Sequence, residues 1–363
     1  MKKYYDIKRI KETQCEYNLI YGQRSNGKSY AVKHYVGERA VDPNKKFILL
    51  RRQQVDTVPS ANANYFKDFN HRKIYGEDCI GMQIRGGQIF AVYKHNARHE
   101  KIPVKLVGYV CSLSSNAHYT GQNFNDVENI VYEEVISRSI YLNNEPDILQ
   151  DFVSTVFRER NDGKVWLIGN SISRMCPYFT DWELTKVPKQ ADGTIDIYEK
   201  HTGRYDEDGN ELITRIAVER SESMKAESKM FFGSRSKMIT EGAWQTDEHP
   251  RLERRLETYA VLYSLVFEYT KFKYMARFLY DPENECHFWY IEPKTTEIKK
   301  GTRVVSDKFY PDDMCTIGLV ALSPEEQSIL KQIGQMNCVF SDNLTGTEFY
   351  QAYKMLGRLM RSS

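Results

Sequence analysis

Short apolar runs alternate with amphipathic stretches over the first half of the chain. Apolar runs of about four to eight residues predict buried strands, and apolar positions spaced three or four apart predict helices. Strands that alternate with helices build a mostly parallel sheet covered on both faces, so we expect an α/β domain over residues 1–198. The predicted strands are 17–21, 46–50, 80–93 (a hairpin around Gly86-Gly87), 104–113, 129–132 and 165–168, and the predicted helices are 28–38 and 147–160.

The pattern changes near residue 198. Residues 188–210 are rich in Gly and Asp, which favour turns and loops, with one short strand expected near Ile195, and residues 219–232 have helical spacing. These features predict a linker with a short helical module over residues 199–255. Residues 256–363 then carry strand-like runs followed by helical stretches, which predicts a smaller α+β domain. Its predicted strands are 262–269, 273–280 and 286–291, and its predicted helices are 323–333 and 347–360.

The chain is nearly neutral overall, with 51 Lys and Arg against 49 Asp and Glu in 363 residues. This balance argues against a basic tail that coats nucleic acid and against an acidic disordered chain. The charge is nevertheless uneven. Residues 1–60 hold thirteen Lys and Arg against six acids, and residues 121–162 hold three against nine. The basic stretch contains Arg51 and Arg52, which could follow a phosphate backbone, although a solvated face is the commoner role.

The cysteines and the apolar runs exclude several classes. The seven cysteines are dispersed and form no C-x-x-C pair, so we expect free thiols and no zinc ribbon or redox pair. No apolar run approaches the ~18 residues of a membrane span, so no membrane partner is expected. Aromatic residues make up 13% of the chain. Sheet packing explains this excess better than base stacking, because Tyr and Phe favour half-buried pleated surfaces.

A phosphate-binding loop is predicted where the first strand ends and the first helix begins. The sequence there fits G-x-x-x-x-G-K-[ST], in which backbone N–H groups and a helix N-terminus converge on phosphate oxygens. We expect Lys28 to reach the β- and γ-phosphates of ATP and Ser29 to help hold Mg²⁺. Arg24 is a further candidate for phosphate contact, with solvent exposure as the alternative. The predicted nucleotide-binding residues are Gly22, Gln23, Arg24, Ser25, Asn26, Gly27, Lys28 and Ser29.

Two acids follow the apolar run at 129–132. An ATPase with such a loop needs an acid at the end of a buried strand to orient Mg²⁺, and a base to activate water. Glu133 is placed for the first role and Glu134 for the second. A Glu stands where Asp is commoner beside the metal, so Glu133 is expected to act directly or through a water. The alternative is a pair of solvated acids.

Polar residues beyond the acids complete the predicted catalytic set. Asn170 follows the strand at 165–168, where a side chain can sense the γ-phosphate or the attacking water, and its alternative role is a helix N-cap. Arg158 and Arg160 end the predicted helix at 147–160. Either could enter the site of a neighbouring subunit as a trans-acting finger, which would offset charge in the transition state. A solvated pair is the alternative.

In this order and spacing, the motifs resemble those of the DNA packaging (encapsidation) ATPases of φ29-like tailed bacteriophages, which are related to large terminases. The resemblance covers most of residues 17–180. It is carried by residues 17–30 around the loop, Phe47-Ile-Leu-Leu-Arg-Arg52, Gly108-Tyr-Val-Cys-Ser-Leu-Ser114, Phe157-Arg-Glu-Arg160, and Leu167-Ile-Gly-Asn-Ser171 with Pro177-Tyr-Phe179.

The resemblance implies an ASCE-type (RecA-like) P-loop ATPase followed by a vestigial, inactive RNase H-like nuclease domain. It implies a homomeric ring, expected to be a pentamer, that pumps double-stranded DNA into a preformed capsid. The implied partners are DNA, further copies of the chain, the capsid portal (connector) and, as in some relatives, a structural RNA. The implied location is the host bacterial cytoplasm, transiently at the portal vertex of the prohead.

Other functions stay open at this point. A different ATP-dependent DNA translocase or helicase would share the site, and a terminase would add an active nuclease. A member of another class would bind nucleotide as a structural switch and do no motor work. An unwinding assay, a nuclease assay and DNA-stimulated turnover distinguish these alternatives.

Overall fold

The computed structural model describes most of the chain in two compact units. One unit comprises Met1–Ile172, Cys176–Phe231 and Ser236–Trp244, and the other comprises Ser173–Met175, Phe232–Arg235 and Gln245–Ser363. No helix formed by the described residues is both long enough and apolar enough to cross a membrane. The described residues are 4–62, 64–95, 102–137, 141–158, 160–224, 236, 241, 243–244, 246–270, 272–298, 301–306, 323–335 and 337–362.

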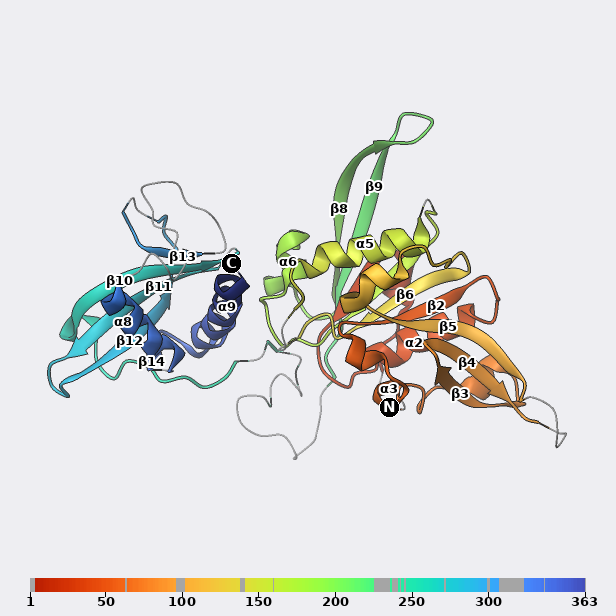
Figure 1. The fold of residues 1–363 in the computed structure, drawn as a ribbon, viewed down its shortest axis with the longest axis horizontal. Helices are drawn as coiled ribbons and strands as arrows, with labels where there is room; N and C mark the ends of the chain where they lie inside the picture. Colours follow the sequence, from red (N-terminus) through yellow and green to blue (C-terminus); the bar gives the residue numbers. More distant parts are fainter. Residues whose placement is uncertain are drawn as a thin grey trace. The chain divides into compact units, whose positions relative to one another are not determined.

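The first unit is built on a nine-stranded sheet in the order β3-β4-β5-β2-β6-β7-β1-β9-β8 (Figure 1). The pairs from β5 to β9 are parallel, and antiparallel pairs close both edges. The strands are β1 Tyr17–Tyr21, β2 Lys46–Arg51, β3 Cys79–Arg85, β4 Gln88–Tyr93, β5 Val104–Ser112, β6 Val127–Glu133, β7 Lys164–Ile168, β8 Thr194–Tyr205 and β9 Glu211–Arg220.

Helices cover the central strands of this sheet. Helix α2 packs on β2, β6 and β7, and its Val32 and Val36 share one buried cluster with Phe47, Leu49 and Val131. Helix α5 packs on β6 on the opposite face of the sheet, the face of Tyr132, which follows Val131 in the strand. The Tyr132 hydroxyl donates to Glu145 of α5 at 2.6 Å. The helices are α1 Lys8–Glu12, α2 Lys28–Arg39, α3 Pro59–Asn62, α4 His71–Tyr75, α5 Glu145–Phe157 and α6 Pro177–Asp181, with 3-10 turns η1 Gln54–Thr57, η2 Leu113–Tyr119 and η3 Val187–Lys189.

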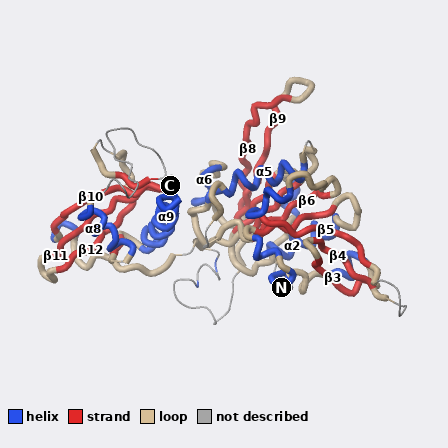
Figure 2. Tube along the Cα trace, viewed as in Figure 1, coloured by secondary structure: helices blue, strands red, loops and turns tan. Residues whose placement is uncertain are grey.

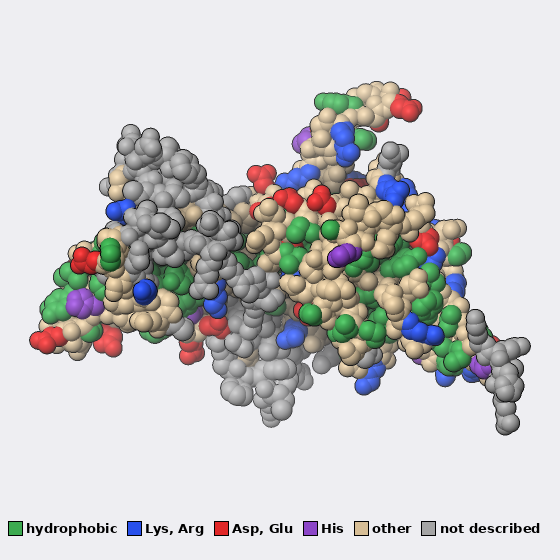
Figure 3. All heavy atoms as spheres, viewed as in Figure 1, with side chains coloured by type: hydrophobic (Ala, Val, Ile, Leu, Met, Phe, Trp, Pro, Cys, Tyr) green, Lys and Arg blue, Asp and Glu red, His purple; other side chains and the backbone are tan. Residues whose placement is uncertain are grey.

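Residues 194–220 differ from the prediction. The sequence predicted a loop to residue 210 with one short strand near Ile195, and a linker from residue 199. Ile195 does lie in a strand, but the whole segment forms the β8–β9 hairpin, and residue 198 lies inside β8. Strand β9 was missed because its apolar core, residues 216–218, is short and is flanked by charged residues. The far end of the hairpin stands away from the body of the unit and carries exposed acids from 206 to 208 (Figures 1 and 3). Most of the predicted helical module at 219–232 lies outside the described residues.

In the described residues of the second unit, helices α8 and α9 accompany a five-stranded sheet (Figure 2). The strand order is β13-β10-β11-β12-β14, with antiparallel pairing from β10 to β12 and parallel pairing at both edges. Its buried cluster contains Trp289, Phe267, Phe340 and Phe349, so aromatic residues fill this core. The elements are η4 Leu256–Thr258, β10 Ala260–Tyr269, β11 Phe272–Asp281, β12 Cys286–Pro293, β13 Val304–Ser306, α8 Pro324–Gly334, β14 Cys338–Phe340 and α9 Asn343–Ser362.

Candidate functional site

The predicted phosphate loop connects β1 to α2. Gly22 and Gly27 have φ angles of 143° and 98°, a region in which a side chain would strain the backbone. Gly27 caps α2, so the first N–H groups of a 12-residue helix point into the loop. Arg24 and Ser25 are exposed at the bend. The local sequence therefore builds a concave N–H surface suited to an anion.

Lys28 is buried at the base of this loop. Its Nζ donates to the carbonyl oxygen of Gln23 at 2.5 Å, to Oδ1 of Asn26 at 3.1 Å and to Oδ1 of Asn170 at 3.4 Å. Burial lowers its pKa to about 7, and the nearby Glu133 carboxylate opposes that shift. The three acceptors of Lys28 are neutral, so an anion arriving in the loop would stabilise the charged form.

Ser29 and Glu133 lie beside each other although they belong to α2 and β6. Burial raises the pKa of Glu133, and hydrogen bonds from Tyr65 and Ser29 partly counteract this rise. The Tyr65 hydroxyl donates to Glu133 Oε1 at 3.2 Å. Hydroxyl and carboxylate oxygens are the donors that Mg²⁺ prefers, so this pair fits that ion. The two residues line a cavity of about 440 Å³ together with Lys33, Asn64, Tyr65, Lys67 and Asp68.

Glu134 is the residue at which the chain leaves β6. It is exposed and has a φ of 60°, so the backbone turns sharply between the two acids. Its carbonyl oxygen accepts from Nη2 of Arg52 at 3.2 Å, and that of Val135 accepts from the same nitrogen at 3.1 Å. Arg52 thus stabilises the turn that carries Glu134 through its main-chain carbonyl groups.

Arg52 corrects a sequence expectation, because it is buried and does not belong to a basic surface. Its Nε donates to Glu145 Oε2 at 2.8 Å, and the Glu145 side chain has no exposed surface. Glu145 also accepts from the hydroxyls of Tyr132 and Tyr178, at 2.6 and 3.1 Å. Charge spacing alone cannot reveal this ion pair, since Arg52 directly follows β2 and Glu145 is the first residue of α5. On the face drawn in Figure 3, Lys and Arg side chains are scattered over the first unit and do not gather into one patch.

Asn170 follows β7, which lies between β1 and β6 in the sheet. The next helix, α6, begins at Pro177 with Cys176 as its N-cap, so Asn170 is not a helix cap. The adjacent Ser171 donates its amide to Gly22 O at 3.1 Å, and its buried hydroxyl has no hydrogen-bond partner among the described residues. The loop after β7 thus presents polar groups to the phosphate loop.

The two candidate finger arginines have different surroundings. Helix α5 ends at Phe157, and Arg158 follows it as an exposed residue with a φ of 51°. Its side chain donates to Gln122 O at 3.1 Å. Arg160 is held by the carbonyl oxygens of Asn125 and Val127, at 2.7 and 2.8 Å, and by an ion pair with Asp162. Arg160 therefore braces its own chain, and Arg158 has more freedom to reach a neighbour.

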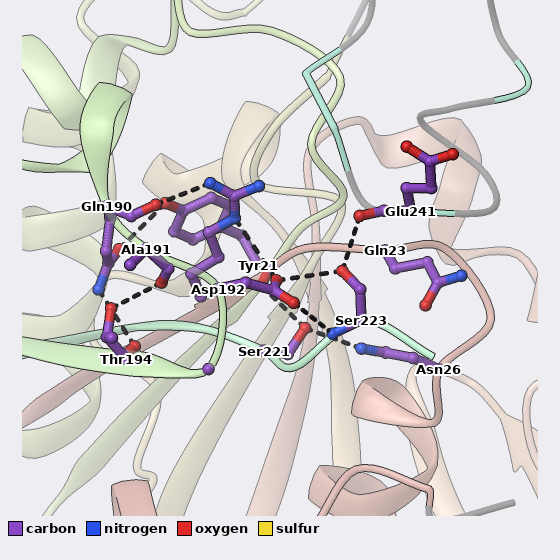
Figure 4. A network of polar contacts seen from close by, with 12 residues as sticks. Tyr21, Gln23, Asn26, Gln190, Ala191, Asp192, Thr194, Ser221, Ser223 and Glu241 are labelled. Carbon is purple, nitrogen blue, oxygen red and sulfur yellow. Dashed lines mark hydrogen bonds and ion pairs between the residues drawn. The ribbon is translucent and has the colours of Figure 1, made fainter. Parts of the chain in front are cut away.

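The side-chain amides of Gln23 and Asn26 contact residues 221–224 after β9, a contact that the sequence did not predict; Figure 4 shows Asn26 bonded to Ser221. Gln23 exchanges two hydrogen bonds with the main chain of Met224: Nε2 donates to Met224 O at 2.8 Å, and Oε1 accepts from Met224 N at 2.5 Å. Asn26 Nδ2 donates to Ser221 Oγ at 2.8 Å. The parallel pairing of β1 with β9 brings these segments together.

Comparison with known proteins adds the family. The model of the Podovirus DNA encapsidation protein (Gp16) matches residues 1–203. The DNA packaging protein of Bacillus phage B103 is 29% identical over 165 residues, 45% of this chain and 46% of that protein. The DNA packaging protein of Bacillus phage phi29 is 28% identical over 170 residues, 46% of each. The aligned part thus spans about half the length of these curated relatives.

Two solved structures resemble the whole chain. The bacteriophage Phi-29 viral genome packaging motor assembly has a TM-score of 0.54 at 18% identity, covering 97% of this chain and 99% of that chain. The Phi-28 gp11 DNA packaging motor has a TM-score of 0.51 at 16% identity, covering 97% of both chains. At these identities the likeness is one of fold. Because the family model matches 203 of 363 residues, the chain belongs to the Podovirus DNA encapsidation protein (Gp16) family.

Proposed function

We propose that this protein is an ATPase that drives double-stranded viral DNA into a preformed capsid. The observation that carries the proposal is the meeting of two sequence-distant residues with adjacent residues of one loop: Asn170 with Lys28, and Glu133 with Ser29. Family membership directs this chemistry to DNA packaging. The strand order, with β7 between the loop strand β1 and the acid strand β6, supports an ASCE-type P-loop fold.

Bound ATP with Mg²⁺ would supply the transferable phosphoryl group and the metal that neutralises its charge. The N–H groups of residues 22–29 and Lys28 would hold the phosphates, and Ser29 and Glu133 would hold the metal. The Glu134 carboxylate would accept a proton from the attacking water, and Asn170 would position Lys28 or the water. Arg158 of a neighbouring copy would approach the site from outside, which requires a ring, and we propose a pentamer.

The proposed partners are double-stranded DNA, other copies of this chain, the portal (connector) of the capsid and a structural RNA. The proposed place of action is the prohead portal vertex in the host cytoplasm. We propose a vestigial nuclease fold for the second unit. In support, two of its buried acids are paired with cations: Asp281 with Arg254, and Glu268 with Lys273 at 3.9 Å.

The deciding experiment compares the wild-type chain with Glu134→Gln, which keeps the size of the side chain but removes the base. The variant should bind an ATP analogue with unchanged affinity and lose at least about 100-fold in turnover. Substantial remaining hydrolysis would defeat the assignment of the base. DNA-stimulated turnover without strand separation would support a packaging motor over a helicase or a nucleotide switch, and metal-dependent DNA cleavage would favour a terminase with an active nuclease.

A further inference from the structure

The segment after β9, residues 221–224, is bonded to the phosphate loop although nearly the whole first unit separates them in sequence. Tyr21 of β1 pairs with Arg220 of β9 in parallel register, so the two strands end next to each other at the carboxyl ends of the parallel strands. The Ser221 amide donates to Tyr21 O at 2.8 Å. We call residues 221–224 the exit segment, because the residues that follow connect the two units.

Ser221 and Gln23 fix the exit segment to the loop at two points. The fully buried Ser221 hydroxyl donates to Tyr21 O at 3.0 Å and accepts from Asn26 Nδ2. Gln23 is also buried, and its amide pairs with both main-chain polar groups of Met224. A Cβ on Gly22 would lie 2.4 Å from Ser221 Oγ, so the two segments are packed as closely as backbone and side chain allow.

Lys28 links these contacts to the phosphate site. An ammonium group has three N–H donors, and the Nζ of Lys28 is directed to three oxygens. Two of these oxygens belong to Gln23 and Asn26, the residues that hold the exit segment. A phosphate can therefore take a full hydrogen bond from Lys28 only if one of the three present contacts weakens.

We propose that Gln23, Asn26 and Ser221 couple phosphate binding at Lys28 to the exit segment, and that Ser221 is a positioning residue for the loop. The inference rests on the proposed nucleotide site. Coupling of this kind is reciprocal: if phosphate binding disturbs the bonds of Gln23 and Asn26 with the exit segment, loss of those bonds alters nucleotide affinity in turn. The exit segment would thereby respond to the occupancy of the loop.

Hydrogen exchange of the full-length protein tests the coupling, with ATPγS and Mg²⁺ as the probe. In the wild type, the exchange rates of the Ser221 and Met224 amides should change by about threefold or more on binding. In Ser221→Ala, ATPγS should still bind, with a dissociation constant about 5-fold higher because one hydrogen bond that orders the loop is lost, and the response at Met224 should shrink.

Ser223→Ala is the matched control. Its hydroxyl bonds to Asp192 and to Glu241 O, neither of which belongs to the loop, so both the affinity and the exchange response should stay as in the wild type. Gln23→Met is a second variant, which removes both bonds to Met224 in case Ser221→Ala fails to fold. It should speed exchange at Met224 without nucleotide and abolish the response.

The outcomes separate the two proposals. Binding of ATPγS with unchanged exchange at residues 221–224 would overturn the coupling and leave the nucleotide site intact. Equal effects of Ser221→Ala and Ser223→Ala would also overturn it. Failure of the wild type to bind ATPγS would overturn the proposed function itself, and the coupling with it.

Discussion

The side-chain oxygen of Asn170 lies 3.4 Å from Nζ of Lys28, across 142 residues of sequence. The contact exists because β7 pairs directly with β1, with Ile168 opposite Ile20, so both strands end at the same edge of the sheet. A single polar side chain can thus respond to the group that would hold the γ-phosphate.

Replacement of Asn170 by Ala should lower turnover more than binding. The variant keeps the whole phosphate loop, so the dissociation constant for ATP should change by less than about fivefold, the equivalent of one hydrogen bond. The catalytic rate should fall about 100-fold, as when one preorganised polar group is removed from an active site. Steady-state hydrolysis combined with equilibrium binding separates the two effects, and a loss of affinity alone would assign Asn170 to binding.

Arg158→Ala should abolish turnover in the assembled protein, whereas Arg160→Ala should mainly reduce stability. Arg160 is bonded to two main-chain carbonyl groups, and their loss should lower the free energy of unfolding by about 1–3 kcal/mol. Mixing provides the control for Arg158. In rings assembled from a mixture of Arg158→Ala subunits and Glu134→Gln subunits, the second kind supplies an intact Arg158. The Arg158→Ala subunits should therefore regain hydrolysis. No recovery in the mixture would rule out action between subunits.

Nucleotide affinity should fall as the pH rises above about 7. In the nucleotide-free protein, burial lowers the pKa of Lys28 to about 7, and a bound phosphate would raise this pKa. At a pH between these two pKa values, nucleotide binding therefore takes up a proton. Below pH 7 the lysine is already charged and this dependence disappears. Calorimetry from pH 6 to 9 in buffers of different ionisation enthalpy measures the uptake. Lys28→Arg, which stays charged, should show none, and a flat affinity for the wild type would contradict the prediction.

Removal of one partner of the buried Arg52–Glu145 pair should be strongly destabilising. Arg52→Met leaves the Glu145 carboxylate buried without its cation, which costs about 3–5 kcal/mol. The double variant Arg52→Met with Glu145→Gln should lose less than the sum of the two single variants, because the uncompensated charge is gone. Urea unfolding followed by circular dichroism tests this, and simple additivity would show that the pair is not coupled.

The parts predictable from the sequence are those whose signal is local. The loop at 22–29, the strands around it and the position of the two acids at the end of β6 all follow from short patterns. Asn170 could be predicted as a candidate because it follows a recognisable strand. For each of these residues, the pattern that predicts its role lies in the few positions beside it.

The remaining features depend on pairing between distant segments. Arg52 looks like half of a basic pair until Glu145 is placed against it, and Arg158 and Arg160 look equivalent until Asn125 and Val127 are placed beside one of them. Gln23 and Asn26 look like loop residues that would only face a ligand, although their side-chain NH2 groups donate to the exit segment. These partners are far apart in the sequence, and the order of the strands in the sheet brings them together. No sequence-spacing rule therefore predicts their contacts.

The position of β9 in the sheet also affects when the site is completed during synthesis. Ser221 is made 195 residues after Asn26, its partner in the loop. At ribosomal rates of 5–20 residues per second, Ser221 is synthesised about 10–40 s after Asn26. Residues 1–203, the part matched by the family model, contain every predicted phosphate-binding and catalytic residue but end before β9. A nascent chain of that length would therefore carry the chemistry of the site without the strand that fixes its shape.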